Sequence, residues 1–251
     1  MSNANPLSEH IATVRDHLRE GSLTLAWFSL GSIPLVEIGA RTGHAAAVID
    51  LQHGLWDRMS AYLAVSAIRE VPVLMRAAAN TDLAICEALD SGAAGVIVPY
   101  VETRAEAEAA VAAARFPAGG HRSAGSVRAL AEGLVECVAA KPVVGLMIES
   151  ALGVENAAAI ASVPEVDFVF IGPGDLALSL DSFPQVDDRH ANACLAVQDA
   201  CRFAGVPCGI FCMSAEDARA RSGQGFAAVV PANDIGVVAN GFTLPDAAVA
   251  D

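Results

Sequence analysis

Short apolar runs alternate with amphipathic segments along the chain, and this alternation predicts the fold. Eight runs are continuously apolar, as is typical of parallel strands buried on both faces. They span residues 23–30, 45–50, 71–76, 95–100, 143–148, 166–171, 207–212 and 226–230. Segments with a helical period lie between them, over 34–42, 56–69, 81–90, 102–115, 129–140, 155–162, 188–204 and 215–221. Eight strand–helix units in 251 residues indicate an α/β protein with a (β/α)8 TIM barrel.

The two ends of the chain also have helical patterns. Residues 7–20 predict a helix that ends at Gly21, and the tail over 234–250 is weakly helical. No linker or change of composition marks a second domain, so we expect one barrel domain over residues 1–251. The alternative is an open doubly wound sheet, but its glycine-rich fingerprint after the first strand is missing.

The sixth apolar run stops at Gly172-Pro173-Gly174, and Asp175 follows. This order predicts a buried strand, a tight loop and a helix that starts at or just after Asp175. The glycines allow a ligand close to the backbone, and the N–H groups at a helix start favour an anion. The carboxylate could hold a divalent cation beside that anion. The alternative is a plain turn in which Asp175 is the N-cap.

Polar side chains collect where the apolar runs end. Asp50 and His53 follow the second run, Arg76 closes the third, Glu149 follows the fifth and Asp175 the sixth. In this barrel the carboxyl ends of all strands meet at the face that binds ligands. Glu149 and Asp175 offer the oxygen ligands that suit Mg²⁺ or Mn²⁺. Arg76 suits an oxyanion, and His53 is a candidate general base.

Each assignment has a structural alternative. Glu149 could cap the next helix or pair with Arg76, and Arg76 could form an ion pair between strands. His53 could be a surface residue without a role. Trp27, on the first strand, could line the pocket or simply fill the barrel.

Composition narrows the function classes. The net charge is −14 and the pI about 4.7, which disfavours nucleic acid or an anionic membrane as partner. The six cysteines form no C-x-x-C pair, residues 1–6 lack a signal-peptide core, and no apolar stretch could span a bilayer. We therefore expect a cytoplasmic protein with a small-molecule substrate. The only lysine, Lys141, precedes the fifth strand, which disfavours a Schiff-base aldolase.

Several motifs, in order along the chain, resemble the HpcH/HpaI family of class II, metal-dependent 2-oxoacid aldolases on the phosphoenolpyruvate/pyruvate barrel. The motifs are Trp27-Phe28-Ser29-Leu30-Gly31, Ile49-Asp50-Leu51-Gln52-His53-Gly54, Leu89-Asp90-Ser91-Gly92-Ala93, Val98-Pro99, Gly120-His121-Arg122-Ser123, Ile148-Glu149-Ser150 and Phe170-Ile171-Gly172-Pro173-Gly174-Asp175-Leu176.

The resemblance implies a role for each strand-end residue. Glu149 and Asp175 match the ligands of a divalent cation (Mg²⁺, Mn²⁺ or Co²⁺). Arg76 matches the arginine that holds the keto oxygen and stabilises the enolate. The backbone at Gly174 and Asp175 matches the cradle of the pyruvate carboxylate.

The acid–base machinery is implied in the same way. His53 matches its histidine, Asp90 the aspartate that pairs with that histidine across a subunit boundary, and Asp50 a further acidic residue nearby. The resemblance also implies a hexamer, a dimer of trimers, with a C-terminal helix exchanged between subunits. Gln52 and Met147 stand where glutamate and glutamine occur in family members, which bears on the substrate more than on the reaction.

The implied reaction is reversible cleavage of a 4-hydroxy-2-oxoacid into pyruvate or hydroxypyruvate and an aldehyde, through an enolate stabilised by the metal. The oxoacid could be 4-hydroxy-2-oxoheptanedioate or a 2-keto-3-deoxy sugar acid. We expect the aldehyde to contact Trp27, Phe211 and the glycine-rich loop over 118–126, which includes Ser123. The alternatives are a lyase of the malyl- or citryl-CoA type on the same barrel and a non-enzymatic oxoacid-binding module.

Overall fold

The fold is a closed barrel of eight parallel strands in sequence order, in a computed structural model that describes residues 6–243. The strands are β1 (Leu23–Phe28), β2 (Ala46–Asp50), β3 (Val73–Arg76), β4 (Gly95–Val98), β5 (Val143–Ile148), β6 (Phe168–Ile171), β7 (Cys208–Ile210) and β8 (Ala228–Asn233). Each strand pairs with the next, and β8 pairs with β1 to close the barrel. The predicted (β/α)8 fold is therefore confirmed.

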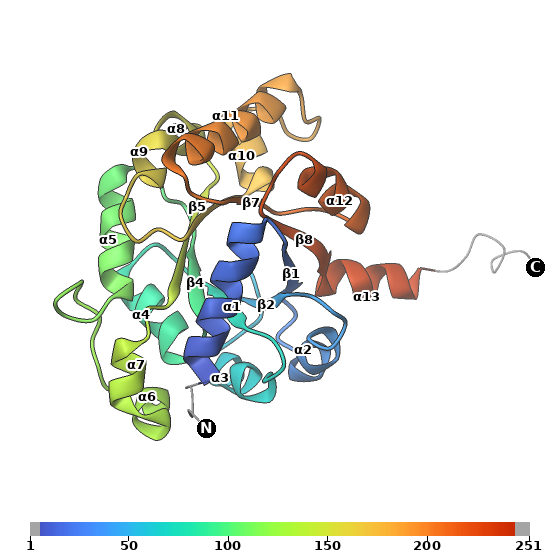
Figure 1. Ribbon diagram of the computed structural model, residues 1–251. Coiled ribbons are helices and arrows are strands. Elements are labelled where there is room, and N and C mark those ends of the chain that lie inside the picture. The colour runs from blue at the N-terminus through green and yellow to red at the C-terminus, as the bar shows by residue number, and fades with distance from the viewer. Residues whose placement is uncertain (1–5, 244–251) are drawn as a thin grey trace, which may run out of the picture.

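Helices surround the barrel (Figure 1). They are α1 (Pro6–Glu20), α2 (Ile33–Gly39), α3 (Arg58–Ala67), α4 (Asp82–Asp90), α5 (Arg104–Ala114), α6 (Val127–Glu132), α7 (Leu134–Ala139), α8 (Ala151–Glu155), α9 (Ala157–Ala161), α10 (Pro173–Ser179), α11 (Asp188–Ala204), α12 (Ala215–Gly223) and α13 (Asp234–Phe242). Side-chain caps start several of these helices. Thr103 and Glu106, for example, form a capping box at the start of α5.

The period-2 geometry of the strands divides the apolar residues between two cores. Along β1, Leu25 and Trp27 face the barrel interior, whereas Ala26 and Phe28 pack under the helices. The apolar face of α1 belongs to the interior core as well and closes the amino end of the barrel. The opposite end, where the strands finish, is left for polar side chains.

Several predicted boundaries were wrong for local reasons. The helix expected over 129–140 is divided into α6 and α7 by Gly133, which has φ 112°. The helix expected to begin at or after Asp175 begins at Pro173, because proline is favoured in the first turn and Gly172 takes the N-cap position. Asp175 is therefore not the N-cap. The last strand continues beyond Val230 to Asn233.

The C-terminal helix α13 extends away from the barrel (Figure 1). Its sequence is apolar, yet Asp234 is its only buried residue, and Ile235, Val237 and Phe242 are 54%, 58% and 84% exposed. The helical tail predicted over 234–250 is confirmed as far as Phe242. The remainder of that prediction, like the polar segment 1–5, lies outside the described residues. None of the described helices is long and apolar enough to cross a membrane.

Candidate active site

Asp50 and Arg76 form a buried ion pair at the carboxyl end of the barrel. They are the last residues of β2 and β3 and lie opposite each other in the parallel register. Arg76 donates from Nε to Oδ1 at 2.8 Å and from Nη2 to Oδ2 at 2.5 Å. Burial raises the pKa of Asp50, but the hydrogen bonds and charge of Arg76 outweigh burial and leave that pKa below its usual value. The inter-strand pair considered for Arg76 is thus present.

One guanidinium nitrogen of Arg76 is available to bind a ligand. Its Nη1 has no hydrogen-bond partner within residues 6–243, while Asp50 fixes the other side of the guanidinium. The guanidinium also lies 5.2 Å over the ring of Trp27. A planar cation held in this way can present Nη1 to an oxyanion without reorganising.

Trp27 is 2% exposed and forms the floor of the mouth rather than an open wall. Its ring stacks on Phe170 at 5.8 Å and meets Phe211 edge-on at 5.3 Å. Its Nε1 donates to Asp50 at 3.3 Å. Phe211 follows β7 and is only partly buried, so its ring reaches the mouth.

Glu149 follows β5 directly and is 1% exposed. Its Oε1 accepts from the N–H of Tyr100 at 2.9 Å. Burial raises the pKa of Glu149 to about 7, against the Tyr100 hydrogen bond, and the charge of Asp175 adds to the rise. Glu149 neither caps α8, which Ser150 does, nor forms an ion pair with Arg76.

Gly172, directly after β6, packs against the carboxylate of Glu149. A Cβ at position 172 would overlap the Glu149 carboxyl group, whereas a Cβ at Gly174 would meet no atom within 4 Å. Within residues 6–243 the N–H groups of Gly174 and Asp175 make no hydrogen bond, as expected in the first turn of α10. They remain free to bind an anion.

His190 supports this turn from behind. It is 4% exposed on α11, and its Nε2 lies 2.9 Å from the carbonyl oxygen of Pro173. The contact anchors the start of α10, which carries Asp175.

Glu149 and Asp175 fit a hard divalent cation. They offer oxygen donors alone, and the charge of Asp175 acts on Glu149. No group of three or more His, Cys, Asp or Glu within the described residues could hold a metal. The chain would therefore supply two ligands, leaving the other positions to water or substrate oxygens, as Mg²⁺ and Mn²⁺ commonly allow.

His53 is exposed on the loop after β2, and Asp50 orders this loop by accepting from the N–H groups of Gln52 at 3.0 Å and His53 at 3.3 Å. The Oε1 atom of Gln52 is buried without a partner within residues 6–243. Neither a hydrogen bond nor an ion pair joins His53 to Asp90 in this part of the chain.

Asp90, the last residue of α4, pairs instead with Arg122 at 2.9 Å. Arg122 belongs to the glycine-rich loop, and His121 of the same loop lies 2.9 Å from Asp82, at the start of α4. Within residues 6–243 no hydrogen bond or ion pair links this loop to Glu149, Asp175 or Arg76. The exposed Ser123 lies beside α4, where its backbone contacts the thiol of Cys86.

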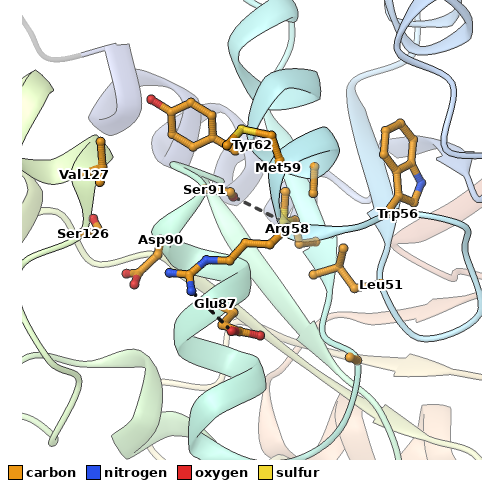
Figure 2. Close-up of a pocket in the computed structure, with 13 residues that line it drawn as sticks. Leu51, Trp56, Arg58, Met59, Tyr62, Glu87, Asp90, Ser91, Ser126 and Val127 are labelled. Atoms are coloured by element: carbon orange, nitrogen blue, oxygen red, sulfur yellow. Dashed lines mark hydrogen bonds and ion pairs between the residues drawn. The ribbon is translucent and has the colours of Figure 1, made fainter.

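A separate cavity of about 500 Å³ lies between α3 and α4, outside the strands. Figure 2 shows Asp90 at its edge and Arg58 extending across it toward Glu87, with which it pairs at 3.6 Å. Leu51, two positions before His53, lies at the far side. The cavity thus connects the surroundings of Asp90 with the base of the His53 loop.

Comparisons with known proteins identify the family of the chain. Residues 24–241 match the family described as HpcH/HpaI aldolase/citrate lyase. The chain is 36% identical to a hydroxypyruvate/pyruvate aldolase of Rhizorhabdus wittichii, covering 90% of this chain and 93% of that protein. It is 32% identical to a 5-keto-4-deoxy-D-glucarate aldolase of Salmonella arizonae, covering 84% and 86%. A crystal structure of a family protein from Burkholderia cenocepacia superposes with a TM-score of 0.85 at 31% identity, covering 91% and 95%. The chain therefore belongs to the HpcH/HpaI aldolase/citrate lyase family.

Proposed function

We propose that this chain is a divalent-metal-dependent aldolase that reversibly cleaves a 4-hydroxy-2-oxoacid into pyruvate or hydroxypyruvate and an aldehyde. The observation that carries the proposal is the pair Glu149 and Asp175 beside the free Nη1 of Arg76. Relatives named as aldolases support a lyase of this type. Lys141 pairs with Glu165 at 2.8 Å and precedes β5, so it lies at the opposite end of that strand from Glu149 and offers no Schiff base at the mouth.

Each residue of the mouth has a separate task in this reaction. Glu149 and Asp175 would hold the cation, which supplies Lewis-acid polarisation of the oxoacid when bound. The Nη1 of Arg76 donates to the oxygen on which charge develops, and Asp50 keeps the guanidinium in place. The N–H groups of Gly174 and Asp175 bind the donor carboxylate. His53 moves the proton of the aldehyde-derived hydroxyl group.

A compact donor suits the apolar floor. Trp27 and Phe211 meet edge-on beneath Arg76, and Met147 is buried in the barrel interior. These side chains offer no further charge to a substrate. We therefore propose pyruvate or hydroxypyruvate as donor, and the relatives named for a hydroxypyruvate/pyruvate substrate support this choice.

A homo-oligomer would complete the site. The apolar side chains of Ile235, Val237 and Phe242 on α13 are exposed within residues 6–243, and Asp90 lines a cavity without contacting its own His53 by a hydrogen bond or ion pair there. We propose that α13 packs on a second copy and that Asp90 and the loop with Ser123 serve the site of that copy. The hexamer and the cytoplasmic location expected from the sequence stay predictions.

Release of pyruvate or hydroxypyruvate tests the function directly. A panel of 4-hydroxy-2-oxoacids, including a seven-carbon dicarboxylate and 2-keto-3-deoxy sugar acids, is assayed with Mg²⁺, Mn²⁺ or Co²⁺ and with EDTA. We expect turnover that EDTA abolishes and that Glu149→Gln and Asp175→Asn reduce at least about 100-fold, as for loss of a group acting in the transition state.

The matched control is Glu155→Gln, which neutralises an exposed glutamate on α8. Turnover that persists in EDTA would contradict the metal-dependent reaction. Cleavage of malyl- or citryl-CoA esters alone would identify the thioester lyase, and no turnover of any substrate would identify a binding module.

A further inference from the structure

Asp234 is a buried carboxylate that the proposed chemistry does not use. It is the first residue of α13, directly after β8, and is 6% exposed. The helix does not need it as a cap, because the side chain of Asn233 already accepts from the N–H of Gly236 at 2.8 Å. No arginine, lysine or histidine within residues 6–243 forms an ion pair with it. A buried charge without a counter-ion persists only where hydrogen bonds compensate its desolvation.

Backbone N–H groups supply that compensation, and most of them belong to a distant segment. Ser29 donates its N–H to both oxygens of Asp234 at 3.0 Å, and Leu30 donates to Oδ2 at 2.8 Å. Ile235 donates to Oδ1 at 2.9 Å. The carboxylate thus fastens the connection after β1 to the end of β8, across the seam that closes the barrel.

The fastened segment touches the catalytic residues on its other side. The hydroxyl of Ser29 donates to Asp50 Oδ2 at 3.2 Å, and the carbonyl oxygen of Ser29 accepts from the N–H of Leu55 at 2.7 Å. A Cβ at Gly31 would lie 2.6 Å from the carbonyl oxygen of Leu55, so the two loops pack without spare room. Ser29 therefore connects Asp234 by hydrogen bonds both to Asp50 and to the loop that carries His53.

We propose that Asp234 is a positioning residue for the aldol reaction, acting through Ser29 on Asp50 and on the His53 loop. The inference rests on the proposed aldolase function. A shift of about 1 Å in a catalytic group can cost about 100-fold in rate, so a clamp on both loops has a measurable consequence. Through the same residue, the start of α13 is tied to the active site.

Asp234→Asn is the sharpest substitution, because the amide keeps the shape but turns one acceptor into a donor that faces N–H groups. We expect kcat per folded molecule to fall about 10- to 100-fold, with KM for the oxoacid within about threefold of wild type. The control Asp188→Asn neutralises an exposed aspartate at the start of α11 and should leave both constants unchanged.

Ser29→Ala separates positioning from general stability. It removes the hydroxyl link to Asp50 but keeps the N–H that binds Asp234. If Asp234 acts through Ser29, the double variant loses less activity than the product of the two single losses. Independent losses, or an unchanged kcat per folded molecule in Asp234→Asn, would overturn the inference.

Amide hydrogen exchange gives a readout that does not depend on turnover. Asp234→Asn should speed exchange at Leu55, whose N–H is bonded to Ser29, while Asp188→Asn should not. The two tryptophans of the chain report on the same network, since Trp27 donates to Asp50 and Trp56 to the carbonyl of Phe28. Unchanged exchange and fluorescence would refute the clamp even in a protein without aldolase activity. If the wild-type protein turns over no oxoacid but Asp234→Asn still speeds exchange at Leu55, only the proposed function is rejected.

Discussion

Gly172 offers the strictest test of Glu149 and Asp175 as the proposed metal ligands, because the structure gives it a matched control two positions along the same loop. A Cβ at Gly172 would overlap the carboxyl group of Glu149 and lie 2.9 Å from its Cβ. A Cβ at Gly174 would meet no atom within 4 Å. Neither glycine has a positive φ, so alanine is compatible with the backbone at both positions. Gly172→Ala and Gly174→Ala therefore differ in steric overlap rather than in backbone strain.

The magnitude follows from two opposing effects. Overpacking a filled interior costs about 1–3 kcal/mol, and replacing glycine by alanine restores about 0.4–1 kcal/mol by restricting the unfolded chain. Gly174→Ala should thus be neutral or slightly stabilising, and Gly172→Ala should lose about 1–2 kcal/mol. For a domain of this size that loss lowers the Tm by about 2–8 °C. Relief of the overlap should displace the Glu149 carboxylate, because Glu149 Oε2 is the atom that the added Cβ would approach most closely.

The assay measures metal binding rather than activity. Titration with Mn²⁺, followed by calorimetry or by the paramagnetic signal of free Mn²⁺, should give a Kd for Gly172→Ala at least about tenfold above wild type, equivalent to about 1.4 kcal/mol. Gly174→Ala should bind Mn²⁺ as wild type does. If it also raises KM for the oxoacid, the exposed N–H groups beside it serve the substrate carboxylate. Wild-type Mn²⁺ affinity and Tm in Gly172→Ala would refute the proposed contact between this glycine and the metal ligand.

Other predictions follow from the same contacts. In EDTA, Glu149 should stabilise the fold most below pH about 4.5 and lose this contribution as the pH rises through about 7, because its pKa is raised in the folded state. The free energy of unfolding should change by about 3 kcal/mol over this range. Urea titrations at successive pH values measure the change, and Glu149→Gln should abolish it. His190→Phe should lower the free energy of unfolding by about 1–3 kcal/mol and weaken Mn²⁺ binding, because the carbonyl of Pro173 loses its hydrogen bond. Calorimetry measures both effects, and unchanged Mn²⁺ binding would show that His190 does not support the metal ligands. Val237→Asp on α13 should reduce the molar mass in light scattering, whereas Phe203→Asp, on the 93% exposed aromatic side chain of α11, should not.

The positions of Asp50, Arg76 and Glu149 could be predicted from the sequence because they depend only on where strands end. A parallel barrel places all carboxyl ends at one face, so an apolar run that stops at a charged residue locates that residue in space. Hydrophobic pattern alone cannot say which partner each charge finds there. Asp50 was expected near the histidine, and the structure shows that it holds Arg76, Trp27 and the His53 loop together.

His190 and Asp234 were missed for different reasons. His190 lies on a long amphipathic helix, and its burial depends on how α10 packs against α11, which sequence spacing does not encode. Asp234 had a usable signal. The apolar pattern predicts an eighth strand that ends at Val230, which places Asp234 in the C-terminal tail. In the structure β8 continues to Asn233. With the correct boundary, Asp234 follows its strand directly, as Glu149 follows β5, and the same reasoning would have included it.

The four carboxylates at the mouth differ in how their charge is balanced, and this difference argues for a cation. Asp50 is paired with Arg76, and Asp234 accepts from three backbone N–H groups. Glu149 accepts from a single N–H, and neither Glu149 nor Asp175 has a cationic partner within residues 6–243. Burial is the main cause that raises the pKa of Glu149 to about 7, and repulsion by the charge of Asp175 adds to it. A divalent cation between these two carboxylates would remove the repulsion, whereas at Asp50 or Asp234 it would compete with donors already in place. The charge distribution therefore supports Glu149 and Asp175 as the location of the proposed cation, beside the free nitrogen of Arg76.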